Sequence, residues 1–215
     1  MSIVSQTHKK KEFTTEIENF NELVNIGFSL HNHICPAMPL GVRAGLLALK
    51  KLKVNRSKNK ELKMIVENGP SHAALCFSDG LQVATSCTFG KGNIIRTNEG
   101  KNAFTLIDNR TNRAVRMSIK YDFFTKMLQS DFVQKRKQGI EPYDIDAIVA
   151  LTAIQSMLQV QEDKIFLISE IFEIQQEKKP GTFEYGQCDE CKEPIFESGL
   201  RRKGDKLLCQ KCSGY

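Results

Sequence analysis

The chain has 215 residues, of which 40% are hydrophobic and 26% charged, and these proportions are ordinary for a globular protein. No run approaches the roughly 20 apolar residues of a membrane span, and the polar start does not resemble a secretory signal, so we expect a cytoplasmic protein with no membrane partner. Much of the net charge of +6 comes from a cluster between Lys50 and Lys63, at an expected helix end and loop, which favours a solvated surface over an anion-docking face.

The first half of the chain is expected to combine helices with short strands. Helical periodicity covers residues 16–30 and 39–52, and a third helix is expected over residues 71–85. A strand is predicted at residues 62–67. Further β-prone runs at 93–96, 103–108 and 114–121 are separated by turn residues, which favours an antiparallel sheet.

The second half continues with predicted helices over residues 122–138 and 143–158 and a final strand over 164–174. Because helices and strands mix without a strict βαβ repeat, the predicted fold class is α+β, an antiparallel or mixed sheet core domain with flanking helices. The core domain is expected to span residues 1–175. A linker over 176–182, containing Lys178-Lys179-Pro180-Gly181, then leads to a small zinc-finger domain over 183–215.

The stretch His31-Asn32-His33-Ile34-Cys35-Pro36 contains three candidate metal ligands within five residues. In an extended backbone, alternate residues face the same side, which predicts that His31, His33 and Cys35 point into one cleft. Pro36 favours a helix start, which would place Cys35 at the N-cap, where the helix dipole lowers the pKa of a thiol. The alternative is that these side chains only satisfy polar and apolar needs at a helix entrance.

The C-terminal module contains a C-x2-C-x17-C-x2-C pattern formed by Cys188, Cys191, Cys209 and Cys212. This spacing predicts a tetrahedral zinc site, and four thiolates leave no open coordination position, so the zinc is expected to be structural. The module resembles the zinc finger of the DksA/TraR family. From residue 176 to the end, eight Lys/Arg face seven Asp/Glu, a balance that disfavours nucleic-acid binding and leaves protein docking as the alternative.

A glycine-rich turn follows Cys87, with Gly90 and Gly92 on either side of Lys91. Backbone N–H groups beside an ammonium group predict a loop that binds a small anionic ligand. The alternative is a tight turn whose lysine is solvated.

These segments together resemble the FmdE family, which is named after a formylmethanofuran dehydrogenase, over roughly residues 20 to 175. The matching residues are His31-x-His33-x-Cys35-Pro36, Leu40-Gly41-x-Arg43-x-Gly45, Cys76-x-x-Asp79-Gly80-x-Gln82, Cys87-Thr88-Phe89-Gly90-Lys91-Gly92-Asn93 and Gly100-Lys101. Asn32 and Ala37 stand where the family usually has glycine.

The resemblance implies a homodimer with a metal in a core cleft, held by His31, His33, Cys35 and Cys76, with Asp79, Cys87 and Lys91 nearby. A mixed histidine and cysteine donor set suits zinc, or nickel, cobalt or iron. On this hypothesis His33 and Cys35 are catalytic, and Lys91 orients an anionic ligand.

The family also implies an accessory subunit of a molybdenum or tungsten formylmethanofuran dehydrogenase, an oxidoreductase whose pterin cofactor other subunits hold. The alternatives are a non-catalytic carrier of metal or pterin, a regulatory subunit, and a zinc-ribbon nucleic-acid binder.

Overall fold

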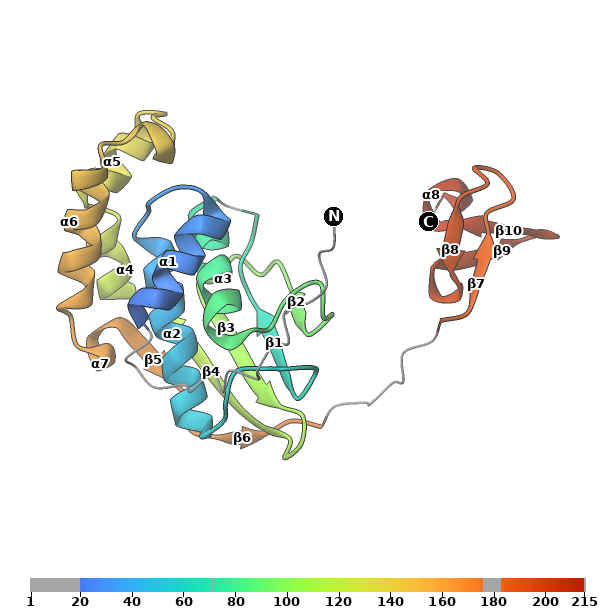
Figure 1. The fold of residues 1–215 in the computed structure, drawn as a ribbon, viewed down its shortest axis with the longest axis horizontal. Coiled ribbons are helices and arrows are strands. Elements are labelled where there is room, and N and C mark those ends of the chain that lie inside the picture. Colours follow the sequence, from blue (N-terminus) through green and yellow to red (C-terminus); the bar gives the residue numbers. More distant parts are fainter. Residues whose placement is uncertain (1–19, 71, 176–182, 215) are drawn as a thin grey trace, which may run out of the picture. The chain divides into compact units, whose positions relative to one another are not determined.

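The computed structural model describes residues 20–70, 72–175 and 183–214 (Figure 1). The contacts divide the chain into two compact units that part between Gln176 and Glu177. The predicted linker and the first four residues of the first predicted helix lie outside the described residues. Within the described part, no helix is long and apolar enough to cross a membrane.

The first unit is built on a six-stranded sheet whose main strand order is β2-β1-β3-β4-β5. The strands are β1 (Leu62–Val66), β2 (Ile94–Arg96), β3 (Ala103–Asp108), β4 (Arg113–Ile119), β5 (Phe166–Ile168) and β6 (Phe172–Glu173). The antiparallel expectation is wrong for β2, which pairs parallel to β1 because helix α3 makes the crossover between them. The other pairs are antiparallel, so the fold is α+β with a mixed sheet.

Three helices lie together over this sheet: α1 (Phe20–His31), α2 (Ala37–Leu52) and α3 (His72–Thr85) (Figure 1). Side chains of α2 and α3, including Leu40, Leu49 and Leu81, join Leu106 and Met117 of the central strands in one buried cluster. This burial supplies the main hydrophobic stabilisation of the unit.

Two glycines allow α2 and α3 to pack with their backbones almost in contact. A Cβ atom on Gly41 would lie 2.1 Å from the carbonyl oxygen of Phe77, and one on Gly80 would lie 2.1 Å from that of Met38. No side chain fits at either position. The close approach brings the segment before α2 next to the first half of α3.

The remaining helices of the first unit are α4 (Tyr121–Met127), α5 (Asp131–Lys137), α6 (Ala147–Leu158) and α7 (Glu162–Ile165), with a 3-10 turn at Pro142–Asp144. The predicted helix over 122–138 is wrong in its continuity, because Ser130 ends one helix and caps the next by accepting from the amide of Val133. Likewise, α6 begins only after Asp146, whose side chain accepts from the amide of Ile148. Arg43 of α2 donates to the carbonyls of Met157 and Val160 and so ties the end of α6 to α2.

The predicted strand over 164–174 is two short strands preceded by the turn of α7. β5 pairs with one end of β4 and β6 with the other. Alternating apolar residues in this run suggest one continuous strand, but residues 169–171 do not belong to either one.

The second unit consists of two antiparallel hairpins and a terminal helical turn. Its elements are β7 (Tyr185–Gln187), β8 (Pro194–Phe196), a 3-10 turn (Glu197–Gly199), β9 (Leu200–Lys203), β10 (Lys206–Cys209) and α8 (Gln210–Ser213). Few apolar side chains are buried here besides Cys188 and Leu208.

Candidate metal centre

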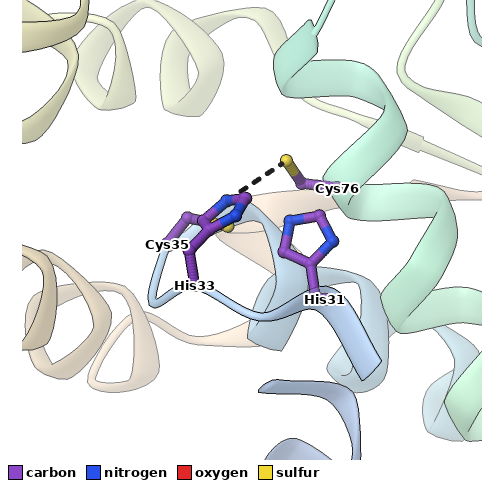
Figure 2. Close-up of side chains that lie close together, drawn as sticks. All are labelled: His31, His33, Cys35 and Cys76. Carbon is purple, nitrogen blue, oxygen red and sulfur yellow. Dashed lines mark hydrogen bonds between the residues drawn. The ribbon is translucent and has the colours of Figure 1, made fainter. Parts of the chain in front are cut away.

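Four side chains from three parts of the core unit meet at one point (Figure 2). His31 is the last residue of α1, His33 and Cys35 follow in the segment that leads into α2, and Cys76 lies on α3. One potential ligand atom of each residue lies within 4.8 Å of the other three. The structure therefore brings together the four residues that the sequence indicated for the core site.

The backbone reaches this arrangement by a turn and not by the predicted extended segment. His31 is still helical, and Asn32 has a φ of 58°, in the left-handed region. Asparagine adopts this conformation more readily than most residues, which explains how it replaces the glycine of the family pattern. The N-cap of α2 is Pro36, so the prediction that Cys35 is the N-cap is wrong by one residue.

Asp79 holds His31 in place from the adjacent helix. The Nδ1 atom of His31 lies 2.8 Å from a carboxylate oxygen of Asp79, whose other oxygen accepts from the amide of Gln82. The second ring nitrogen of His31, Nε2, is buried and has no hydrogen-bond partner among the described residues. An imidazole fixed by a carboxylate, with its second nitrogen free, is the usual arrangement of a metal-binding histidine.

The two cysteines and His33 complete the donor set. Cys35 and Cys76 are each 3% exposed, and the Sγ atom of Cys76 lies 4.0 Å from Nε2 of His33. The rings of His31 and His33 have centroids 4.0 Å apart. Bonds of about 2.0–2.3 Å around tetrahedral zinc separate its ligand atoms by roughly 3.3–3.8 Å, so small side-chain movements would close this cluster on an ion.

The metal-free cluster has strongly perturbed acidities. The hydrogen bond from Asp79, assisted by Cys35, raises the pKa of His31 to about 9. Hydrogen bonding with Cys76 and with His31 lowers the pKa of Cys35, whereas the same contact with Cys35 and burial raise the pKa of Cys76. Cys35 is therefore a thiolate at neutral pH, and the donor set fits a soft or borderline cation.

A cavity of about 320 Å³ adjoins the cluster. His33, Cys35 and Cys76 all contribute to its wall. The sequence motifs do not indicate the rest of this wall, and in particular Asn102, Arg136 and Lys137, because no motif or spacing connects residues on such distant elements.

The loop around Lys91 is not part of this cluster. Cys76 precedes the end of α3 by nine residues, which corresponds to roughly 14 Å of helix, and Cys87 and Lys91 follow that end. Lys91 donates its ammonium to the carbonyl of Ser57, 2.8 Å away. The amides of Lys91 and Gly92 bond to Thr88 and Phe89 within the turn. This geometry favours the structural turn over the anion-binding loop, which stays a prediction.

In the second unit, one sulfur from each of Cys188, Cys191, Cys209 and Cys212 lies within 4.8 Å of the other three. The amide of Cys209 donates to the sulfur of Cys188 and that of Cys212 to the sulfur of Cys209, each at 3.3 Å. Amide donation lowers the pKa of Cys188 to about 6. The four cysteines thus form the compact cluster of thiol groups that a zinc-finger module requires.

Comparison with known proteins identifies the family. The family model described as "FmdE, Molybdenum formylmethanofuran dehydrogenase operon" matches residues 30–167, which include all four residues of the core cluster. The chain belongs to the FmdE family.

Two individual proteins resemble this FmdE-family chain. A protein of Archaeoglobus fulgidus, named a probable S-adenosyl-L-methionine-binding protein, is 28% identical over 196 residues, which are 86% of this chain and 50% of that protein. The chain therefore spans about half the length of this relative. The crystal structure of an FmdE-like protein of a tungsten formylmethanofuran dehydrogenase, from Syntrophus aciditrophicus, matches with a TM-score of 0.55 and 19% identity, covering 91% of this chain and 92% of that one. The second likeness supports the fold.

Proposed function

We propose that this FmdE-family protein binds a transition-metal ion in its core through His31, His33, Cys35 and Cys76. The observation that carries the proposal is the state of His31: Asp79 occupies Nδ1, and the buried Nε2 lacks a partner among the described residues. A buried polar atom without a partner is costly, and a metal bound among the neighbouring sulfur and nitrogen atoms would remove that cost.

The donor set of two imidazoles and two thiolates suits zinc first, and nickel, cobalt or iron as alternatives. Such an ion, when bound, supplies Lewis-acid chemistry. The chain supplies its surroundings. His33 and Cys35 face the cavity, and Asp79 orients His31. Catalytic roles for His33 and Cys35 would follow from that position.

We propose that the four cysteines of the second unit hold a structural zinc. Burial of apolar side chains is too sparse in this unit to stabilise it alone, so most of its folding free energy would come from the metal.

At the level of the cell, the proposed role is that of an accessory subunit of a formylmethanofuran dehydrogenase, or a relative of such a subunit, acting as a homodimer. The description of the matching family model supports the connection with that enzyme. A non-catalytic carrier of metal or pterin, or a regulatory subunit, is the rival role. Rapid transfer of the core metal to a chelator at neutral pH would favour a carrier over a resident metal.

Metal analysis of the purified full chain tests the core site. We expect two metal ions per chain, one lost in His33→Ala and the other in Cys188→Ala. Cys87→Ala is the matched control, because Cys87 is buried outside both clusters and its removal should leave both ions bound. A protein that holds a single ion, lost only in Cys188→Ala, would refute the core site.

A further inference from the structure

The cavity beside the core cluster combines apolar walls with positive charge. Its volume of about 320 Å³ is at the lower end of the range for small-molecule sites, about 300–1,000 Å³. Its apolar lining comes mainly from the side chains of Pro36, Ala37, Leu40, Phe77, Ile119, Phe124, Met127, Leu128, Phe132, Val133 and Pro142. A compact ligand with an apolar body would be stabilised by leaving water for these walls.

Two cations, from the last turn of α5, also line the cavity: Arg136 and Lys137. No aspartate or glutamate is among the described residues of its wall. Like other cations in the last turn of a helix, they interact favourably with the helix dipole, but this alone does not require that they face a cavity.

The guanidinium of Arg136 is held in a defined position. Its Nη1 atom donates to the carbonyl of Ile140 at 2.5 Å and to the carboxylate of Glu141 at 3.0 Å, and its side chain is only 22% exposed. The Nε and Nη2 atoms have no partner among the residues that the structure describes. Lys137 is exposed, and its ammonium likewise makes no ion pair within the described chain. These donors remain available for a ligand.

Asn102 adds a neutral donor to the same cavity. Its Oδ1 accepts from Asn68 at 3.4 Å, and Asn68 in turn accepts from the hydroxyl of Ser78 at 2.9 Å. The network orients the amide of Asn102, so its Nδ2 group is left to donate into the cavity.

We propose that this cavity binds a small organic anion, whose anionic group pairs with Arg136 and Lys137 and whose apolar body extends toward the core cluster. The inference rests on the proposed function for the identity of the reactive end, because the far end of the ligand meets His33, Cys35 and Cys76. A guanidinium with unused N–H groups in apolar surroundings favours an anion strongly, since charge-assisted hydrogen bonds are about twice as strong as neutral ones.

Calorimetric binding of phenylacetate and of its neutral isostere phenylacetamide, at constant ionic strength, tests this assignment on the full chain. Phenylacetate should bind about tenfold or more tightly than phenylacetamide. The double variant Arg136→Gln/Lys137→Gln should remove that preference, and Lys135→Gln should keep it, because Lys135 lies on the same helix but outside the cavity wall. Lys137→Gln alone should reduce the preference, and it preserves the test if loss of Arg136 disturbs the turn after α5.

Equal binding of the two probes, no binding of either, or equal losses in Lys135→Gln and the double variant would overturn the proposal. So would phenylacetate binding that survives in the double variant and disappears on metal removal, since the carboxylate would then occupy the metal. Metal content measured on the same samples separates the two hypotheses. Wild-type protein that keeps its core metal but shows no anion preference refutes only the inference, whereas protein without a core metal refutes the proposed function.

Discussion

Replacing Asp79 with asparagine should separate two opposing effects of this carboxylate on the core metal site. The carboxylate oxygen lies 2.8 Å from Nδ1 of His31, and the side chain of His31 is 11% exposed. Asparagine keeps the shape and can still accept from Nδ1–H, but it lacks the charge that stabilises the imidazolium form.

The first effect is competition between a proton and the metal. Because the pKa of His31 is raised to about 9, a metal that binds at pH 7 must displace a proton from a group about two pH units below its pKa, which weakens binding about a hundredfold. In Asp79→Asn the largest cause of the raised pKa is gone, so this penalty at pH 7 falls. Above pH 9 the wild-type penalty has vanished as well.

The second effect is loss of orientation and basicity. Removal of the group that positions a metal-binding histidine typically weakens metal affinity about 10–100-fold. The two effects oppose each other at pH 7, where we expect nearly equal affinities. At pH 9.5 only the second remains, and Asp79→Asn should bind the core metal about 10–100-fold more weakly than wild type.

Competition with a chromophoric chelator at pH 7 and pH 9.5, on protein whose second unit is saturated with zinc, measures both values. Asp144→Asn is the control, because Asp144 is exposed and lies in the turn before α6. Equal affinity of wild type and Asp79→Asn at pH 9.5 would show that Asp79 does not support a metal ligand. A deficit of the same size at both pH values would show that it does not control the protonation of His31.

Three further variants test the fold and the limits of the site. Gly41→Ala should destabilise the core unit by about 3 kcal/mol or prevent folding, because its Cβ would collide with the carbonyl of Phe77, whereas Gly90→Ala meets nothing within 4 Å and should change the denaturant midpoint little. Cys188→Ala should abolish the folded C-terminal unit and leave the thermal transition of the core unit unchanged, and a lowered core transition would contradict the independence of the two units. Lys91→Gln should leave core metal affinity unchanged, since its ammonium bonds to Ser57, and a loss of affinity would restore Lys91 to the site.

Local sequence signals predict most elements but not where they break. The periodicity that predicts one helix over 122–138 continues through Ser130, although serine followed by an acidic residue is itself a helix-start signal. In the same way, the alternate spacing that begins at His31 suits a strand, yet one left-handed residue, Asn32, produces the same convergence at a helix end. Spacing identifies residues that belong together without specifying the backbone that joins them.

The amino-acid sequence alone is enough to identify the residues of the two candidate metal clusters. Ligands of the second unit repeat at short intervals, and the histidine and cysteine motif of the core is recognisable in its family, so both are local signals. Tertiary packing, in contrast, sets three relations: Asp79 supports His31, Lys91 lies beyond the far end of α3, and Arg136 faces the cavity. Those relations depend on how α2, α3 and α5 pack, and packing is set by long-range contacts, such as the glycine contact between α2 and α3, that no local pattern encodes.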